Sequence, residues 1–301
     1  MPWTENVRLI DDHGERPKKS KSQPALDGST SWGLVMVHLG DKSSRIWWSS
    51  IRESGEWNSD REVLTLRAEQ APTMARGLMV FPDSGSGRIF RASVEPGWVF
   101  NEDDPEPKNA QGWSLAAHIW PAMAFSDGMF HIFYRNKRRD IVHTLLRKDQ
   151  LESQEIPGNS EHGLFASKAR PAIAIMENTL HLVHLGRKSN QIWHSKGEIS
   201  IVDKGELSIE WSEKRVGGQK SKASPALAVF NGRLHMVHIG DSSTRLWHAI
   251  YVPELDSWTQ EQISGQRSKT TPGLASYAGR LHMVHLGEKS NQLWWSRWRD
   301  R

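Results

Sequence analysis

A segment of about 50 residues recurs along the chain, and each copy carries a proline ahead of a short apolar run. Three copies are closely similar and start at Ser167, Ser221 and Ser268, and a fourth starts at Ser20. Two divergent copies lie between the fourth and these three, so that the prolines follow one another at intervals of 47 to 54 residues: Pro24, Pro72, Pro121, Pro171, Pro225 and Pro272. A fixed period in this range identifies an array of small, similar structural units.

Each copy contains four short β-rich runs separated by turn residues. In the copy from Ser221 they read PALAVF, LHMVHIG, RLWHAI and WTQEQI, with an Asn-Gly turn after the first run. Four strands make one blade, and six blades around a channel predict an all-β, six-bladed β-propeller that fills residues 1–301 as a single domain.

The two ends of the chain complement each other. The last copy stops after its third run, and the N-terminal WTENV at Trp3 matches WTQEQI at Trp258. We therefore expect the N-terminal strand to pair with the last blade, which contains Trp294, and to close the ring. Closure would leave no long unpaired sheet edge.

The composition excludes several classes of function. The chain has no cysteine, which excludes disulfides, thiolate metal sites and cysteine nucleophiles. The net charge is only +4, and no apolar run approaches the roughly 18 residues of a membrane span or resembles a signal peptide. We expect no cofactor, no metal and no membrane attachment, with the cytoplasm as the compartment if it is to be assigned at all. The basic run at 135–139 occupies one loop, which favours a solvated turn over a nucleic-acid site. Oligomerisation stays open.

Aromatic or imidazole side chains recur in pairs that are nine residues apart. The three best-kept copies contain His184 and Trp193, His238 and Trp247, and His285 and Trp294. The same offset joins His38 to Trp47, Phe81 to Phe90, and Tyr134 to His143. A hairpin between the second and third runs would make each pair neighbours on one face of a blade. Two interpretations stay open: cross-strand packing that locks adjacent blades, or a stacking platform for a ring such as a sugar.

Polar loops precede the first run of most copies. Four of them carry a Ser-Lys pair: Ser20 and Lys21, Ser167 and Lys168, Ser221 and Lys222, and Ser268 and Lys269. The loops between the second and third runs, on the same face of a propeller, carry Ser43, Ser189, Ser242 and Ser290. The serines are interpreted as caps of tight turns, or alternatively as hydrogen-bond donors for a carbohydrate.

In its architecture the whole chain resembles the propeller lectins, namely the fungal fucose-binding lectins of the Aleuria type and related bacterial lectins with Trp-rich blades. The resemblance rests on the repeated P-x-L-A, G-x-L-x-x-V and L-W-x-S elements. It implies a carbohydrate-binding, lectin-like propeller with repeated sites between blades, at which the three His-Trp pairs named first would contact the ligand. Sugar pockets in the fungal lectins use an Arg, a Glu and an aromatic residue, whereas this sequence shows no repeated Arg-Glu pair.

A second hypothesis is an enzyme. Lectin-like propellers of fungal natural-product pathways act as cyclisation or hetero-Diels-Alder catalysts, and such an enzyme would use one asymmetric pocket at the channel mouth near the third blade. There His118 and Trp120 stand in place of the Ser-Lys loop, and Tyr134 and Arg135 depart from the repeat. His118 and Tyr134 would donate protons or hydrogen bonds, Arg135 would hold an oxygen, and Trp120 would stack on an unsaturated ring. Drift in a tolerant blade is the competing interpretation.

Overall fold

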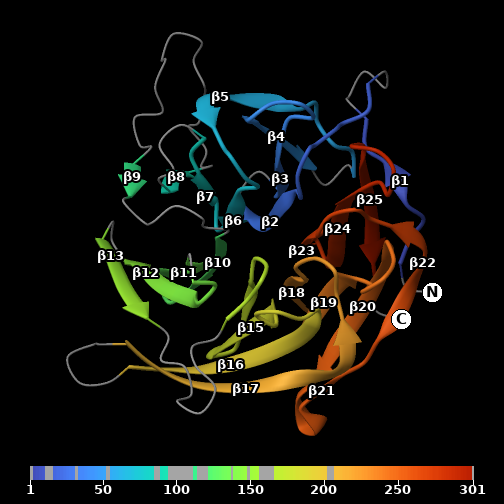
Figure 1. The fold of residues 1–301 in the computed structure, drawn as a ribbon. Coiled ribbons are helices and arrows are strands. Elements are labelled where there is room, and N and C mark those ends of the chain that lie inside the picture. Colours follow the sequence, from blue (N-terminus) through green and yellow to red (C-terminus); the bar gives the residue numbers. More distant parts are fainter. Residues whose placement is uncertain are drawn as a thin grey trace.

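A computed structural model describes residues 3–10, 16–30, 33–51, 55–84, 89–93, 111–113, 121–136, 138–147, 150–155, 166–201 and 207–299. These residues form six antiparallel sheets, which stand around a common axis as the blades of a propeller (Figure 1). The prediction of an all-β, six-bladed propeller is confirmed. A short 3-10 turn, η2 (Pro253–Leu255), interrupts the fifth blade. Within the described ranges, no helix has the length and apolar character needed to cross a membrane.

The strands follow the chain from the axis outward in each blade. Blade 1 contains β2 (Ala25–Thr30), β3 (Gly33–Leu39), β4 (Arg45–Ile51) and β5 (Arg61–Arg67). Blade 2 contains β6 (Thr73–Ala75), β7 (Leu78–Pro82), β8 (Ile89–Ser93) and β9 (Gln111–Trp113), and blade 3 contains β10 (Ala122–Ser126), β11 (Met129–Arg135), β12 (Ile141–Arg147) and β13 (Gln150–Glu155).

The second half repeats this order. Blade 4 contains β14 (Ala172–Met176), β15 (Thr179–Leu185), β16 (Gln191–Ile201) and β17 (Leu207–Lys220). Blade 5 contains β18 (Ala226–Phe230), β19 (Arg233–Ile239), β20 (Arg245–Val252) and an outer strand in two pieces, β21 (Ser257–Trp258) and β22 (Glu261–Arg267). Blade 6 contains β23 (Gly273–Tyr277), β24 (Arg280–Leu286), β25 (Leu293–Trp298) and, from the other end of the chain, β1 (Val7–Arg8).

Tight two-residue turns join the first and second strands of a blade. Asn231 and Gly232 connect β18 to β19 with φ angles of 48° and 67°. Two consecutive positive φ angles define the type I′ turn, whose twist matches that of the flanking strands. The Asn-Gly turn that the sequence predicts is therefore present, and it sets the register of the blade.

The second strand of each complete repeat is buried on both faces. Every residue of β3 is buried, and β19 and β24 are buried after their first residue. The apolar clusters of the described residues each join two neighbouring blades, for example Val37 of blade 1 with Met79 and Phe81 of blade 2. Stacking of blades thus explains why the second run lacks alternation of polar and apolar residues.

The chain ends meet in blade 6, where the N-terminal strand completes the sheet as the sequence predicts. β1 pairs with β25, with Arg8 opposite Trp294, and a further bridge joins Trp3 to Trp298. Trp3 occupies the register position that Trp258 occupies opposite Tyr251 in blade 5. Figure 1 shows both chain ends side by side at the rim, next to β22.

Outer-strand tryptophans hold the blades to one another. Trp57 of blade 1 packs edge-on against Trp295 of blade 6 with 6.2 Å between ring centroids. Trp258 of blade 5 donates its indole N–H to His194 of blade 4 at 3.2 Å, and Trp3 packs on His248 of blade 5. Part of the tryptophan content therefore serves packing between blades.

Candidate functional site

The predicted cross-strand pairs are present in the described hairpins of five blades. His38 lies opposite Trp47, Phe81 opposite Phe90, His184 opposite Trp193, His238 opposite Trp247 and His285 opposite Trp294. Directly opposite residues of an antiparallel pair share one face of the sheet. The nine-residue offset therefore identified the cross-strand neighbours correctly in these blades.

The pairing predicted for blade 3 is wrong. Tyr134 lies opposite Val142, and it is Phe133 that lies opposite His143. The turn is closed by a hydrogen bond from Asn136 N–H to the Asp140 carbonyl, which spans one residue fewer than the bond from Gly240 N–H to the Arg245 carbonyl in blade 5. A connection shortened by one residue shifts every opposite pair by one position.

The histidines of the pairs lie inside the blades. His184, His238 and His285 are 2%, 0% and 0% exposed. Each ring places Nδ1 against the carbonyl of the next residue, at 3.0 to 3.3 Å. The opposite nitrogen, Nε2, meets a polar side chain of the outer strand region in each blade: Glu213, Gln260 or Asn6. This burial favours a role in supporting the indole over direct contact with a ligand.

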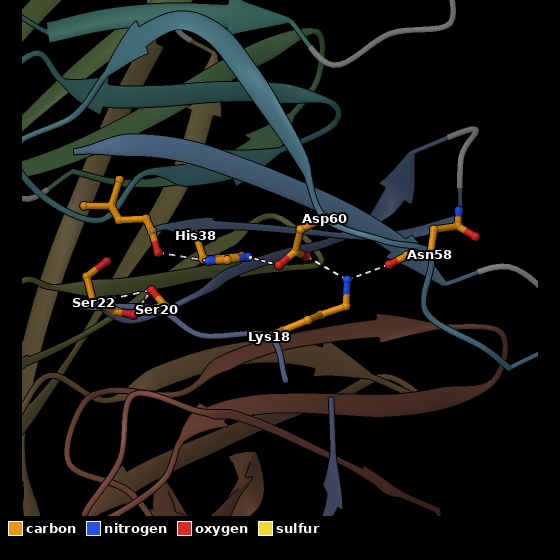
Figure 2. Close-up of polar contacts among 7 residues, drawn as sticks. Lys18, Ser20, Ser22, His38, Asn58 and Asp60 are labelled. Atoms are coloured by element: carbon orange, nitrogen blue, oxygen red, sulfur yellow. Dashed lines mark hydrogen bonds and ion pairs between the residues drawn. The ribbon is translucent and has the colours of Figure 1, made fainter. Parts of the chain in front are cut away.

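Blade 1 extends this arrangement into a buried ionic network (Figure 2). His38 Nε2 lies 3.2 Å from Asp60 Oδ2, and Lys18 Nζ donates to Asp60 Oδ1 at 2.7 Å and to the Asn58 carbonyl at 2.5 Å. Burial alone would raise the pKa of Asp60, but His38 and Lys18 lower it to about 2. The network holds the ring of His38, whose cross-strand partner is Trp47.

The tryptophans of the pairs are only half-buried, in contrast to their partners. Their indoles lie close to the glycine that opens the turn between the second and third strands. A Cβ atom at Gly240 would lie 3.1 Å from Trp247 Nε1 and 2.6 Å from Ser243 Oγ. Only glycine allows the indole to approach the turn so closely. The indole is thus held at the face of the propeller that carries these turns.

A second polar side chain flanks each indole from the outer strand. The residues opposite Trp47, Trp193, Trp247 and Trp294 are, in that order, Glu62, Arg215, Gln262 and Arg8. Each indole therefore lies in a row between a buried histidine and a polar group, on one face of its blade.

Blades 1 and 5 add an arginine to this row. In blade 1, Arg45 Nη1 donates to Glu62 Oε2 at 2.7 Å, and Arg67 lies 3.4 Å from the other carboxylate oxygen. In blade 5, Arg245 Nη1 donates to Gln262 Oε1 at 3.3 Å. An arginine, a carboxylate or amide, and a tryptophan thus recur together in two blades.

Sequence reasoning missed these outer-strand partners. The offset of 17 residues between Arg45 and Glu62 recurs between Arg245 and Gln262, and it was the signal that could have found them. Arg215 of blade 4 stands 22 residues after Trp193, whereas Glu62 stands 15 residues after Trp47. The variable length of the connection to the outer strand hides the repeat.

The serines of both loop types act as turn caps. Ser20, Ser167, Ser221 and Ser268 each donate to the carbonyl two residues on, at 2.6 to 2.8 Å. Ser43 and Ser290 accept from the backbone N–H two residues on. In blade 5 the capping residue is Ser243 and not Ser242, which corrects the predicted position.

A cavity of about 670 Å³ opens at the channel mouth. The loops ahead of the first strands of blades 1, 2, 4, 5 and 6 line it, together with Leu39 at the end of β3. The described residues that line it include the basic side chains of Lys21, Lys168, Arg170, Lys222 and Lys269 and the acidic side chain of Glu69. The loops that the repeat places on one face do converge around the axis.

Blade 3 is described in part. Tyr134 is 8% exposed and packs in the apolar cluster between blades 2 and 3, with Val80 and Ile89. Arg135 Nη1 donates to the Lys168 carbonyl at 3.0 Å and so supports a loop of the channel mouth. His118 and Trp120 lie outside the described residues, so the catalytic roles assigned to this blade stay predictions.

Comparison with known proteins gives a likeness in fold. No protein-family model and no curated protein matches the sequence. Among solved structures, AofleA from Arthrobotrys oligospora superposes with a TM-score of 0.61 at 9% identity, over 98% of this chain and 86% of that chain. The fucose-specific lectin from Aleuria aurantia gives a TM-score of 0.57 at 10% identity, over 94% of both chains. This chain has the fold of the Aleuria-type lectins. A PQQ-bound aldose sugar dehydrogenase from Streptomyces coelicolor shares the architecture at a TM-score of 0.53 and 12% identity, over 98% of both chains.

Proposed function

We propose that this protein binds carbohydrates through repeated sites at the half-buried tryptophans, on the face that also carries the channel mouth. The observation that carries the proposal is the recurrence of arginine, carboxylate or amide, and tryptophan as Arg45, Glu62 and Trp47 in blade 1, and as the corresponding residues of blade 5. The likeness in fold to the fucose-specific lectin from Aleuria aurantia supports a carbohydrate ligand.

The chemistry of the cluster suits a sugar. An indole face packs against the C–H face of a pyranose ring, and planar polar groups beside it orient the hydroxyl groups. Two arginines hold the carboxylate of Glu62, whose side chain is 15% exposed, and Arg45 is 52% exposed and reaches solvent. Groups that are already oriented lose little freedom on binding, which favours affinity in a shallow site.

Blades 4 and 6 would form related sites with different specificity. Their tryptophans, Trp193 and Trp294, face Arg215 and Arg8, while Gln191 and Gln292 replace the arginine of blades 1 and 5. We expect weak individual sites whose binding to a surface rich in glycans is strengthened by multivalency.

The test is a glycan array with the intact protein, followed by substitutions at the sites of blades 1 and 5. Trp47→Ala combined with Trp247→Ala should reduce binding to the best glycan by at least roughly tenfold, because two of four sites are lost and avidity falls with them. Arg45→Ala with Arg245→Ala should act in the same direction.

Arg233→Ala is the matched control, since Arg233 is exposed at the end of β19 that lies away from His238. It should leave binding unchanged. Absence of binding to every glycan, or full binding by both double variants, would contradict the proposal.

A further inference from the structure

We propose that the channel mouth is a second binding site, separate from the tryptophan sites, for a small molecule that carries an oxyanion such as phosphate, sulfate or carboxylate. The charge of the cavity is the first observation. Among the described residues, five basic side chains and one carboxylate line a space of about 670 Å³, which lies within the size range of ligand sites for small molecules.

Arg170 lies where the cavity meets the channel. It lines both the mouth and the narrower section of the channel beneath, and it is half-buried. Burial lowers its pKa to about 10, so the guanidinium remains charged at neutral pH. No carboxylate among the described residues pairs with Arg170. The hydrogen bond that Arg170 forms with a described residue runs from Nη1 to the Pro72 carbonyl across the channel, at 3.5 Å. Arg170 therefore lines the cavity with guanidinium donors that no described carboxylate occupies.

The repeat shows that this arginine is an exception. At the position just ahead of the proline, blades 1, 2, 5 and 6 have Gln23, Ala71, Ser224 and Thr271. The packing of the channel therefore does not require an arginine here. A guanidinium offers a planar pair of donors that matches an oxyanion. Because arginine stands at this position in one repeat only, it would bind the anionic group of a ligand on one side of the channel.

The lysines at the rim supply further charge. Lys21 and Lys222 are exposed, and Lys168 is half-buried. The ammonium groups of these three lysines form no ion pair or hydrogen bond with a described residue, although the Lys168 carbonyl accepts from Arg135. Lys269 is held by Asn291. The nearby carboxylate of Glu288 is engaged by Thr244 and, at 3.5 Å, by Arg267. Like charges gathered around one cavity repel one another, and a bound anion relieves that repulsion.

Buried polar atoms around the cavity are a further observation in favour of a ligand. Ser22 Oγ, Gln70 Oε1 and Thr270 Oγ1 belong to residues that line the mouth, and each is buried without a hydrogen-bond partner among the described residues. Buried polar groups are normally satisfied. These atoms offer bonds to the neutral, hydroxyl-bearing part of a ligand after small side-chain rotations, while Arg170 takes the anionic group.

The experiment measures binding of defined anions to the full chain by isothermal titration calorimetry at constant ionic strength. Inorganic phosphate, sulfate and citrate are the first probes, and glucose 6-phosphate is compared with glucose to separate a free anion from an anionic sugar. Saturable binding of at least one anion to one site per chain is expected. Arg170→Gln, which installs the residue of blade 1, should weaken it at least tenfold, and Lys21→Gln with Lys222→Gln should weaken it several-fold.

Arg233→Gln removes the same charge far from the mouth and should leave the affinity unchanged. If Arg170→Gln lowers the melting temperature, the double lysine variant at exposed positions decides the question. Three results would overturn the proposal: a salt effect without saturable binding, wild-type affinity in both variants, or a loss of affinity in the control equal to that in the variants. Because Trp47 and Trp247 are untouched, glycan binding should persist in Arg170→Gln, so failure of this proposal is distinguishable from failure of carbohydrate binding.

Discussion

Burial inside the blades lowers the pKa of several histidines. In blades 3, 4 and 5 the second and third strands each supply a histidine to a buried, stacked pair, such as His181 and His194 with 2.9 Å between Nδ1 and Nε2. Burial lowers the pKa of His181 to about 4 and that of His194 to about 3. Blade 6 replaces the second histidine by Trp295, whose indole N–H donates to His282. The imidazoles of His181 and His194 are therefore neutral packing groups in the folded protein. Burial likewise lowers the pKa of His131, His143 and His248.

Stability should fall as the pH is lowered from 6.5 towards 4. In this window the unfolded chain takes up protons at histidines that remain neutral in the fold, so the unfolded state binds more protons and gains relative stability. Each such histidine contributes about 1.4 kcal/mol per pH unit. The melting temperature should drop by on the order of 10 °C or more between pH 7.5 and 5.

The variant His181→Leu with His194→Leu removes both partners of one pair together, so that neither imidazole is left buried without the other. The Trp258 indole N–H also loses its acceptor, which lowers stability at every pH and leaves the dependence on pH as the readout. Its melting temperature should depend less steeply on pH than that of the wild type. A melting temperature that stays constant from pH 7.5 to 5 in the wild type, or an unchanged slope in the variant, would show that these histidines do not titrate as described.

At the scale of the element, the hairpin turn carries the most specific sequence information. Asn231 and Gly232 have the residues that a type I′ turn prefers, and the turn in blade 6 places Ala278 at φ 47° ahead of Gly279. Alanine at a positive φ is strained, because its Cβ approaches the following carbonyl oxygen. Asparagine tolerates this conformation better.

Replacing Ala278 by Asn should stabilise the protein by about 0.5–1 kcal/mol. The reciprocal change, Asn231→Ala, should destabilise it by a similar amount. Chemical denaturation at neutral pH measures both. Equal midpoints for the two variants would contradict the assignment of strain to this position.

The hairpins between the second and third strands show what the sequence could and could not predict. A constant connection in blades 1, 4, 5 and 6 let the nine-residue offset predict the His-Trp neighbours correctly. Blade 3 failed because its turn is one residue tighter, which spacing alone does not reveal. Glu62 and Gln262 share an offset of 17 residues from an arginine and could have been found by it. Arg215 could not, because the distance to its outer strand is set by the intervening loop and not by the repeat.

For the whole molecule, the repeat predicted blade number, blade order and closure. The apolar cluster that joins blade 6 to blade 1, with Val284 and Leu34 among its members, closes the ring in the same way as the clusters between consecutive blades. The departures from sixfold repetition are what the fold alone does not explain. Arg170 at the axis and the arginine clusters of blades 1 and 5 are the places where the repeat is broken by polar residues on one common face.

The most direct test of carbohydrate binding is a titration of the protein, labelled with ¹⁵N at the tryptophan indoles, followed by NMR. The chain has 15 tryptophans, and single Trp→Phe variants assign the indole signals. Addition of the glycan selected on the array should move the signals of Trp47 and Trp247, and then those of Trp193 and Trp294, while the packed indoles of Trp57 and Trp258 stay in place. If the shifts fall on the packed indoles, or if the indoles of Trp47, Trp193, Trp247 and Trp294 do not respond at saturating glycan, the account of repeated tryptophan sites is wrong.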